Sequence, residues 1–263
     1  STPDTTKDPV MRVYPGRPPK GSFGDIADMR PFIAGDPDNP GVVHYGKLSI
    51  FEWGEIPAVD NSNTSYEVGG IKSLFDDLFI YGTQDRPYIA RKTGNTESSW
   101  AIVRQFQKIW TLPKLLENIG HDLMAGSKDG CHMLKGVQEY GDLRTFSESD
   151  RVKRIIKTNW TTSAFSAYKP DDGQYWLYLP GYNYILVCHT KHPHRDPTGK
   201  LIYPWTLYEP PITPTCFKQV GDKMLIGCAD GYLYTIGEAQ SKDLGTTKVY
   251  PKFKLAYIQF PFG

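Results

Sequence analysis

The chain has 263 residues, and its 30 basic and 29 acidic side chains leave a formal net charge of +1 at pH 7. This balance argues against bulk attraction to nucleic acid or anionic lipid, and no apolar run approaches the ~18 residues of a membrane-spanning helix. Seventeen tyrosines, 12 phenylalanines and 6 tryptophans, with 25 glycines and 21 prolines to make turns, favour a soluble all-β chain.

Cysteine usage bears on the compartment. The four cysteines, none of them in a C-x-x-C pair, are too few for a disulfide framework in a chain this long. The sequence begins without the charged and apolar segments of a secretory signal peptide. We therefore expect reduced thiols and synthesis in the cytoplasm.

Residues 1–40 are expected to form an extended, proline-rich arm in front of the main domain, which spans residues 41–263. Eight prolines in this segment block regular sheet ladders and favour extended or polyproline conformation. Tyr14, Phe23 and Phe32 lie between the prolines and are candidates for contact with the main domain or with a neighbouring subunit. A disordered tail is the alternative.

One spacing recurs three times, beginning at Asp76, Gly120 and Gly221. Each copy has a turn residue, five mostly apolar residues, a glycine, two further residues, and then Asp-Gly or Asp-Arg. Asp-Gly between apolar runs favours a type I′ hairpin, because Asp and Gly tolerate positive φ best. Each copy therefore predicts a strand, a tight turn and a return strand. The residues assigned to these turns are Asp85, Asp129, Gly130, Asp230 and Gly231. Gly126 and Gly227, in the strands before two of the turns, are expected either to relieve crowding or to form a bulge.

A fourth, looser copy brings the repeat to a regular period. Steps of 44, 53 and 48 residues separate Asp76, Gly120, Gly173 and Gly221. A period of this length, filled with short strands, predicts the blades of a β-propeller. Trp100 and Trp205, each after such a hairpin, are expected to wedge between neighbouring sheets.

We expect about five blades. Four come from the repeat, and the fifth is a composite of residues 42–53 with residues 249–260, which would close the ring. The alternative is that the chain continues beyond Gly263 and its end is missing.

One short helix is predicted over residues 147–157, with Ser147 as its N-cap and Val152, Ile155 and Ile156 on one apolar face. The opposite face is basic and is expected to be solvated. The alternative is contact with phosphate or with an acidic partner through Arg151, Lys153 and Arg154.

No local catalytic signature is present: the sequence has no G-x-S-x-G, H-E-x-x-H, Walker, G-x-G-x-x-G or EF-hand motif. We therefore predict a protein that is not an enzyme and needs no cofactor. Asp129 and Asp230 could pair as catalytic acids, but the glycine after each favours a turn. Propeller glycosidases remain an alternative, because their carboxylates come from different blades without a local motif.

One segment offers several metal-ligating side chains, namely Cys188, His189, His192 and His194. Their spacing matches no zinc module, and successive strand residues point to opposite faces. We predict an exposed hairpin loop here and no metal.

The repeats resemble the β-propeller hub proteins of short-tailed bacteriophages, the tail nozzle and packaged-DNA stabilisation group. The resemblance covers roughly residues 65–263. It rests on residues 117–131 (ENIGHDLMAGSKDGC), 141–156, 167–180 (AYKPDDGQYWLYLP) with 185–188, 203–205 (YPW) and 212–237. The proline-rich arm, and Arg86 in place of the usual glycine, depart from the pattern.

This resemblance implies a structural virion protein of the tail or head-to-tail connector, assembled in the host cytoplasm. It implies a homo-oligomeric ring, contact with other tail or portal proteins, and DNA that passes through without sequence-specific binding. A nearly neutral chain suits such a channel, because a strongly basic wall would slow the exit of DNA. No membrane contact is expected.

Another class of function fits the same fold. A propeller that binds glycans or proteins would be favoured if Tyr182, Tyr184 and Tyr232 clustered, exposed, on one face. A propeller glycosidase would need carboxylates converging on the centre, one of them with a raised pKa.

Overall fold

The computed structural model describes residues 19–46, 53–57, 67–75, 77–83, 87–94, 100–105, 111, 112, 114–137, 142–147, 149–195, 197, 199, 201–235, 242, 243, 247 and 248. This part of the chain consists of antiparallel strands, one α-helix, α1 (Lys153–Asn159), and one short 3₁₀ helix, η1 (Pro180–Tyr182). The prediction of an all-β chain with one short helix is confirmed.

The strands form five successive sheets, each a simple up-and-down meander along the chain. The first sheet contains β1 (Phe23–Ala27), β2 (Arg30–Ala34), β3 (Val42–Gly46) and β4 (Trp53–Pro57). The second contains β5 (Val68–Leu74), β6 (Asp77–Gly82), β7 (Tyr88–Lys92) and β8 (Trp100–Gln105). The third contains β9 (Leu116–Ile119), β10 (Asp122–Ser127), β11 (Gly130–Val137) and β12 (Asp142–Ser147).

The fourth sheet contains β13 (Phe165–Lys169), β14 (Gln174–Leu179), β15 (Tyr184–His189) and β18 (Trp205–Tyr208). The fifth has three strands, β19 (Pro214–Val220), β20 (Lys223–Cys228) and β21 (Leu233–Thr235). Two small hairpins, β16 (His194–Arg195) with β17 (Leu201–Ile202) and β22 (Lys242–Asp243) with β23 (Thr247–Lys248), stand apart from these sheets.

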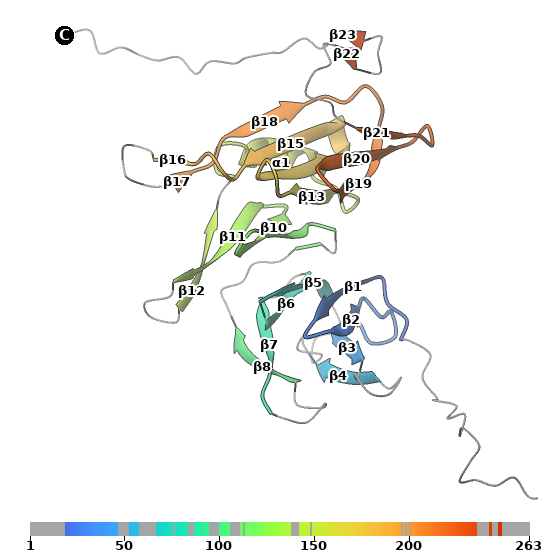
Figure 1. The fold of residues 1–263 in the computed structure, drawn as a ribbon, viewed down its shortest axis with the longest axis vertical. Coiled ribbons are helices and arrows are strands. Elements are labelled where there is room, and N and C mark those ends of the chain that lie inside the picture. The colour runs from blue at the N-terminus through green and yellow to red at the C-terminus, as the bar shows by residue number, and fades with distance from the viewer. Residues whose placement is uncertain are drawn as a thin grey trace, which may run out of the picture.

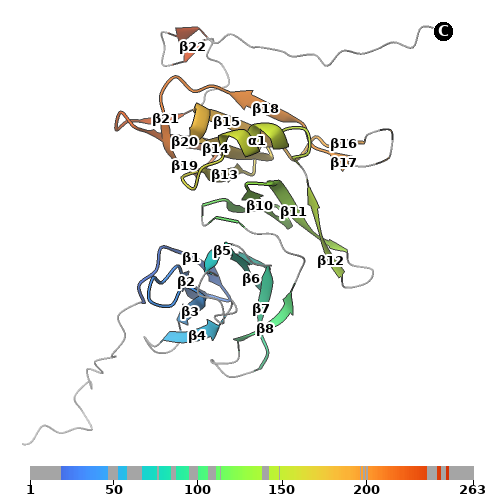
Figure 2. The same cartoon turned by 180° about the vertical axis from the view of Figure 1, so that it is seen from behind.

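Each sheet packs on the next through its first strand: β1 lies against β5, β5 against β9, β9 against β13, and β13 against β19. These strands begin at residues 23, 68, 116, 165 and 214, so the steps are 45, 48, 49 and 49 residues. Both views show the sheets as a stack, with the first sheet at one end and the fourth and fifth near the other (Figures 1 and 2). The stack is therefore a series of five propeller-like units that the described residues do not close into a ring.

Four apolar clusters fill the spaces between successive sheets, because alternate side chains of each strand face opposite neighbours. The cluster between the first and second sheets includes Phe32, Tyr45, Ile80 and Trp100, so Trp100 lies between two sheets as predicted. A smaller cluster joins the second sheet to the third. Further clusters join the third sheet to the fourth, with α1 and a half-buried Trp205 beside them, and the fourth to the fifth.

The composition of the first sheet corrects two expectations. Residues 42–46 and 53–57 are the third and fourth strands of a four-stranded sheet, so this sheet begins before residue 42, where the expected composite blade was to start; residues 249–260, the other half of that composite, lie outside the described residues. The first two strands of this sheet come from residues 23–34, inside the expected arm. A two-residue turn at Asp28 and Met29, both at positive φ (47° and 56°), pairs Ala27 with Arg30. Only one of the eight arm prolines, Pro31, falls in these strands, so the ladder is largely unbroken.

The predicted helix begins later than expected. Ser147 ends strand β12, and α1 begins at Lys153 with Val152 at the N-cap position and no side-chain cap. The apolar face was placed correctly: Ile156 is buried, and Val152 and Ile155 pack against the core between the third and fourth sheets. No helix in the described part of the chain is both long and apolar enough to cross a bilayer.

Candidate functional site

The first strands of four sheets carry a charged residue at one equivalent position. This position lies two residues before the last paired residue of the strand, which is Ala27 in β1, Leu74 in β5, Ile119 in β9, Lys169 in β13 and Val220 in β19. Asp25, Lys72, Glu117 and Lys218 occupy it in the first, second, third and fifth sheets, and Ala167 occupies it in the fourth. We call the four charged residues the charge ladder; their signs alternate along the stack.

Hydrogen bonds and an ion pair join the charge ladder across successive sheets. The Asp25 carboxylate accepts hydrogen bonds from the Ser73 backbone N–H (2.6 Å) and the Ser73 hydroxyl (3.0 Å). Lys72 Nζ lies 3.5 Å from Glu117 Oε2, with both side chains about one-quarter exposed. Asn118, beside Glu117, donates from its amide to the carbonyl of Ser73 (2.8 Å).

Electrostatics at Glu117 reflect the same gathering of charges. Burial raises the pKa of Glu117 and is the largest influence, while the ammonium groups of Lys72 and Lys218 act in the opposite direction and Asp25 adds to the rise. A raised carboxyl pKa at the centre is one feature that a propeller glycosidase would show. Here the neighbours of Glu117 are Lys72, which forms an ion pair with it, and the amide of Asn118. We therefore interpret the charge ladder as a set of paired charges that holds successive sheets together.

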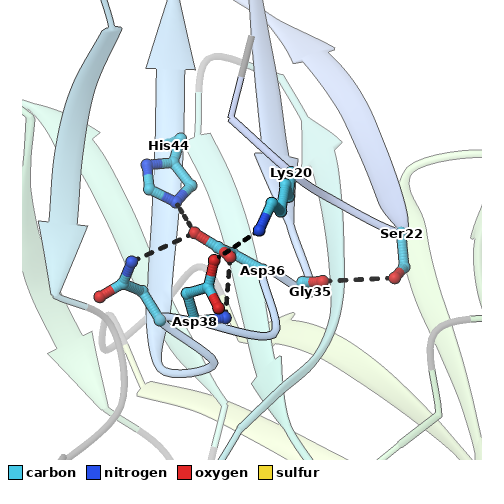
Figure 3. Close-up of polar contacts among 7 residues, drawn as sticks. Lys20, Ser22, Gly35, Asp36, Asp38 and His44 are labelled. Carbon is cyan, nitrogen blue, oxygen red and sulfur yellow. Dashed lines mark hydrogen bonds and ion pairs between the residues drawn. The ribbon is translucent and has the colours of Figure 1, made fainter.

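A second polar cluster lies on the first sheet and was not predicted from the sequence. Asp36 and His44 are both buried, and His44 Nε2 lies 3.2 Å from Asp36 Oδ2 (Figure 3). The same carboxylate accepts hydrogen bonds from the backbone N–H of Asp38 (2.9 Å) and the amide of Asn39 (3.2 Å). Asp38 in turn pairs with Lys20 (2.9 Å) at the exposed surface. The cluster fixes the loop between β2 and β3 on the sheet.

The pKa of Asp36 is lowered in the folded chain. Burial alone would raise it, but the hydrogen bonds from Asp38, Asn39 and His44 together outweigh burial. Because the folded chain favours the ionised form of Asp36, this carboxylate stabilises the fold at pH values above the ordinary pKa of a carboxyl group. That contribution is lost as pH falls through the lowered pKa of Asp36.

Replacing Asp36 by asparagine is expected to lower the free energy of unfolding by about 1–3 kcal/mol near neutral pH, because buried donors lose a charged acceptor. The variant should also lose part of the acid-dependent decline that the wild type shows. Urea unfolding at several pH values measures both effects. Asp38→Asn, at an exposed ion pair, is the matched control and should change stability by less than about 1 kcal/mol. Equal effects of the two substitutions would contradict the assignment.

The residues predicted for hairpin turns lie at or beside turns, with a shift in register. Ser127 pairs with Gly130, so Lys128 and Asp129 are the central residues and Gly130, at φ 126°, follows them. In the fifth sheet, Gly231 (φ 85°) donates its N–H to the carbonyl of Cys228. The prediction that Asp and Gly are the two central residues of a type I′ turn is therefore wrong. The glycine follows the two central residues and takes the position with positive φ. Asp85 lies outside the described residues.

The two strand glycines sit where neighbours are close. A Cβ on Gly126 would lie 3.1 Å from the hydroxyl of Tyr175, and one on Gly227 would lie 2.7 Å from Cys216 Sγ. Both positions therefore avoid crowding, one of the two roles expected for them.

Asp230 has a local partner of its own. Tyr234 donates its hydroxyl hydrogen to Asp230 (2.6 Å), and this hydrogen bond raises the pKa of Tyr234 to about 12 and lowers that of Asp230. Asp230→Asn is expected to return the pKa of Tyr234 toward the ordinary value of about 10. An NMR titration of the Tyr234 ring, assigned with Tyr234→Phe, measures this. Asp222→Asn, at an exposed turn, should leave the pKa of Tyr234 unchanged. If the pKa of Tyr234 did not fall in Asp230→Asn, the hydrogen bond between Tyr234 and Asp230 would be contradicted.

The residues proposed for subunit contact fall into two groups. Phe32 is 1% exposed in the core between the first and second sheets, so its interpretation as a contact with a neighbouring subunit is wrong, and Phe23 packs partly against the same core. Arg151, Lys153 and Arg154 are exposed before and along α1. Tyr14 lies outside the described residues.

The histidine-rich segment is spread over two faces. Cys188 is buried, whereas His189 points the other way and lies 2.8 Å from the Thr206 hydroxyl. Burial lowers the pKa of His189, and the charge of His192 lowers it further. His192 and His194 are exposed. Within the residues described, no three His, Cys, Asp or Glu side chains are grouped so that they could hold a metal ion.

The charge ladder was missed because its first member lies in the segment expected to be an arm. Counting back from each first-hairpin turn would have found it, since the ladder residue always precedes the turn by the same number of positions. The Asp36–His44 pair gives no such signal.

Comparisons with known proteins leave the family open. No family model matches the chain, and no curated protein matches it. Among solved structures, a study of PorZ, "an essential bacterial surface component of the type-IX secretion system" of Porphyromonas gingivalis, provides a similar chain, with a TM-score of 0.49 and 14% identity. The match covers 84% of this chain and 27% of that one, so this chain spans about a quarter of the length of that structure.

Proposed function

We propose that this chain is a structural protein, not an enzyme, and a propeller-type subunit of a bacteriophage tail or head-to-tail connector. In this role it belongs to a ring that helps to retain and release packaged DNA. The observation that carries the proposal is the charge ladder: the strands that join the sheets carry charges of alternating sign, two of them already paired with each other.

The physical reason lies in how DNA is held. Affinity for a duplex comes mainly from lysine and arginine side chains that neutralise phosphates and release counterions. Lys72 is paired with Glu117, and Asp25 lies within electrostatic reach of the same glutamate. A surface of this kind gains little from phosphates, and so DNA can move past it.

Two measurements test the proposal. Antibody raised against the chain and coupled to gold should label the tail region of virus particles released from cells that encode it. The purified chain should show no saturable binding to a 30-base-pair duplex (roughly three helical turns) at physiological salt. Unlabelled particles, or tight binding whose affinity falls steeply with salt, would contradict the proposal.

A second candidate, a glycan- or protein-binding propeller, is favoured by exposed tyrosines. Tyr182 is 63% exposed and stacks on Tyr184 (ring centroids 5.9 Å apart) beside the β14–β15 turn, and Tyr232 is 68% exposed at the equivalent β20–β21 turn of the next sheet. Rings that stack in the open offer a platform for sugars or side chains. A glycan array with wild type and Tyr182→Ala tests this candidate, and glycan binding lost in the variant would favour it over the virion role.

A further inference from the structure

The two end sheets each turn one face away from the rest of the stack. In the fifth sheet, Phe217, Met224 and Ile226 face the fourth sheet and pack in the shared cluster. Because strand side chains alternate, the other face carries Lys218, Val220, Leu225 and Leu233. Of these, Val220 is 56% exposed and Leu233 is 69% exposed, and Lys218 is exposed. This outward surface is called the fifth-sheet face.

The first sheet has a corresponding surface at the other end of the stack. Phe32, Val43 and Tyr45 face the second sheet. The opposite side of β1 and β2 carries Ile26, which is 67% exposed, the exposed Pro31 and the half-buried Ile33. This outward surface is called the first-sheet face.

We propose that the fifth-sheet face of one copy of the chain binds the first-sheet face of a second copy, head to tail. The four contacts inside the chain all follow one rule, in which the first strand of a sheet lies against the first strand of the next. The fifth-sheet face corresponds to the face that the first four sheets turn toward their successors. The first-sheet face corresponds to the face that later sheets turn toward their predecessors. The two faces therefore hold the places of two faces that pack together inside the chain, and they lie at opposite ends of one molecule (Figure 1).

Charge on the fifth-sheet face disfavours one of the two symmetric pairings. Two fifth-sheet faces brought together would oppose Lys218 to Lys218. Asp25, the ladder residue of the first sheet, is not on the first-sheet face, because it pairs with Phe32 and faces the second sheet, where its carboxylate accepts hydrogen bonds from Ser73. A contact between unlike faces avoids the repulsion between lysines, and such a heterologous contact closes into a ring or grows into a chain.

This interface is independent of the virion role, and its test uses variants at exposed positions. Ile26→Glu places a charge on the first-sheet face, and Leu233→Glu places one on the fifth-sheet face. Each should weaken self-association at least about tenfold, because every head-to-tail contact needs both faces. Light scattering after size-exclusion chromatography, over a series of concentrations, measures the mass. His192→Glu, exposed in the loop that follows β15 and away from both faces, should associate as the wild type does.

Mixing the two variants gives the sharpest result. Ile26→Glu keeps an intact fifth-sheet face and Leu233→Glu keeps an intact first-sheet face, so the mixture should form a one-to-one dimer and nothing larger. Cys216, exposed on the fifth-sheet face, should then react more slowly with a maleimide in the assembled protein. A wild type that stays monomeric at every concentration overturns the proposal. So does self-association that persists in either variant alone. Circular dichroism confirms that the variants are folded.

Discussion

Replacing Phe32 by alanine is expected to lower the free energy of unfolding by about 3–5 kcal/mol. The ring is almost fully buried, lies edge-on to Trp100 with centroids 4.9 Å apart, and lies 6.0 Å from Tyr45. Trp100 belongs to the second sheet, so the substitution removes a large buried side chain from the core that joins the first sheet to the second. The midpoint of urea unfolding and the near-ultraviolet circular dichroism of the tryptophans measure the loss.

A control at the same hairpin separates burial from position. Met29, in the β1–β2 turn, is 81% exposed, and Met29→Ala should change stability by less than about 0.5 kcal/mol. The sequence-based interpretation of Phe32 as a contact with a neighbouring subunit makes a different prediction. If Phe32→Ala left the stability of the monomer unchanged and weakened only self-association, that interpretation would be right and the packing described above would be wrong.

The repeat in the sequence located most of the fold. The three copies of the spacing correspond to the second strands β6, β10 and β20 of three sheets, each followed by a hairpin. The looser copy corresponds to β14. These strands were predictable because alternating or continuous apolar runs between turn residues have few other structures available.

The first sheet was missed because its signals conflict. Its first hairpin turns at Asp28-Met29, a pair without glycine, and methionine at positive φ is uncommon. The prolines on both sides then favoured an extended arm. Phe75, at φ 56° in the equivalent turn of the second sheet, shows the same difficulty: the surrounding strands impose the turn, and the residue adopts it.

The candidate sites depend even more on long-range pairing. Asp25 and Ser73 are 48 residues apart, and Lys72 and Glu117 are 45 apart. Nothing local marks them as partners, and only the stacking of first strands brings them together. The helix start was missed for a related reason: Ser147 satisfies a capping pattern but is paired with His132 in the third sheet, and strand pairing prevails over a local cap.

Replacing Gly69 by alanine is expected to lower the free energy of unfolding by about 3 kcal/mol, through overlap with backbone that cannot move away. Gly69 lies at a bulge in β5, where a Cβ would overlap the carbonyl oxygen of Thr111 and approach Thr83 to 3.0 Å. Thr111 is fully buried, and its hydroxyl donates to the carbonyl of Gly126 (2.7 Å) while its N–H donates to that of Gly82. Thr111 thus joins the second sheet to the third, and the methyl group added at residue 69 must either displace Thr111 or distort β5.

Gly221→Asn is the matched control, because φ is 60° there, asparagine tolerates that conformation, and no atom lies within 4 Å of the added Cβ. Urea unfolding should separate the two variants clearly, and equal midpoints would mean that the close approach of Thr111 to β5 contributes nothing to the packing of the two sheets.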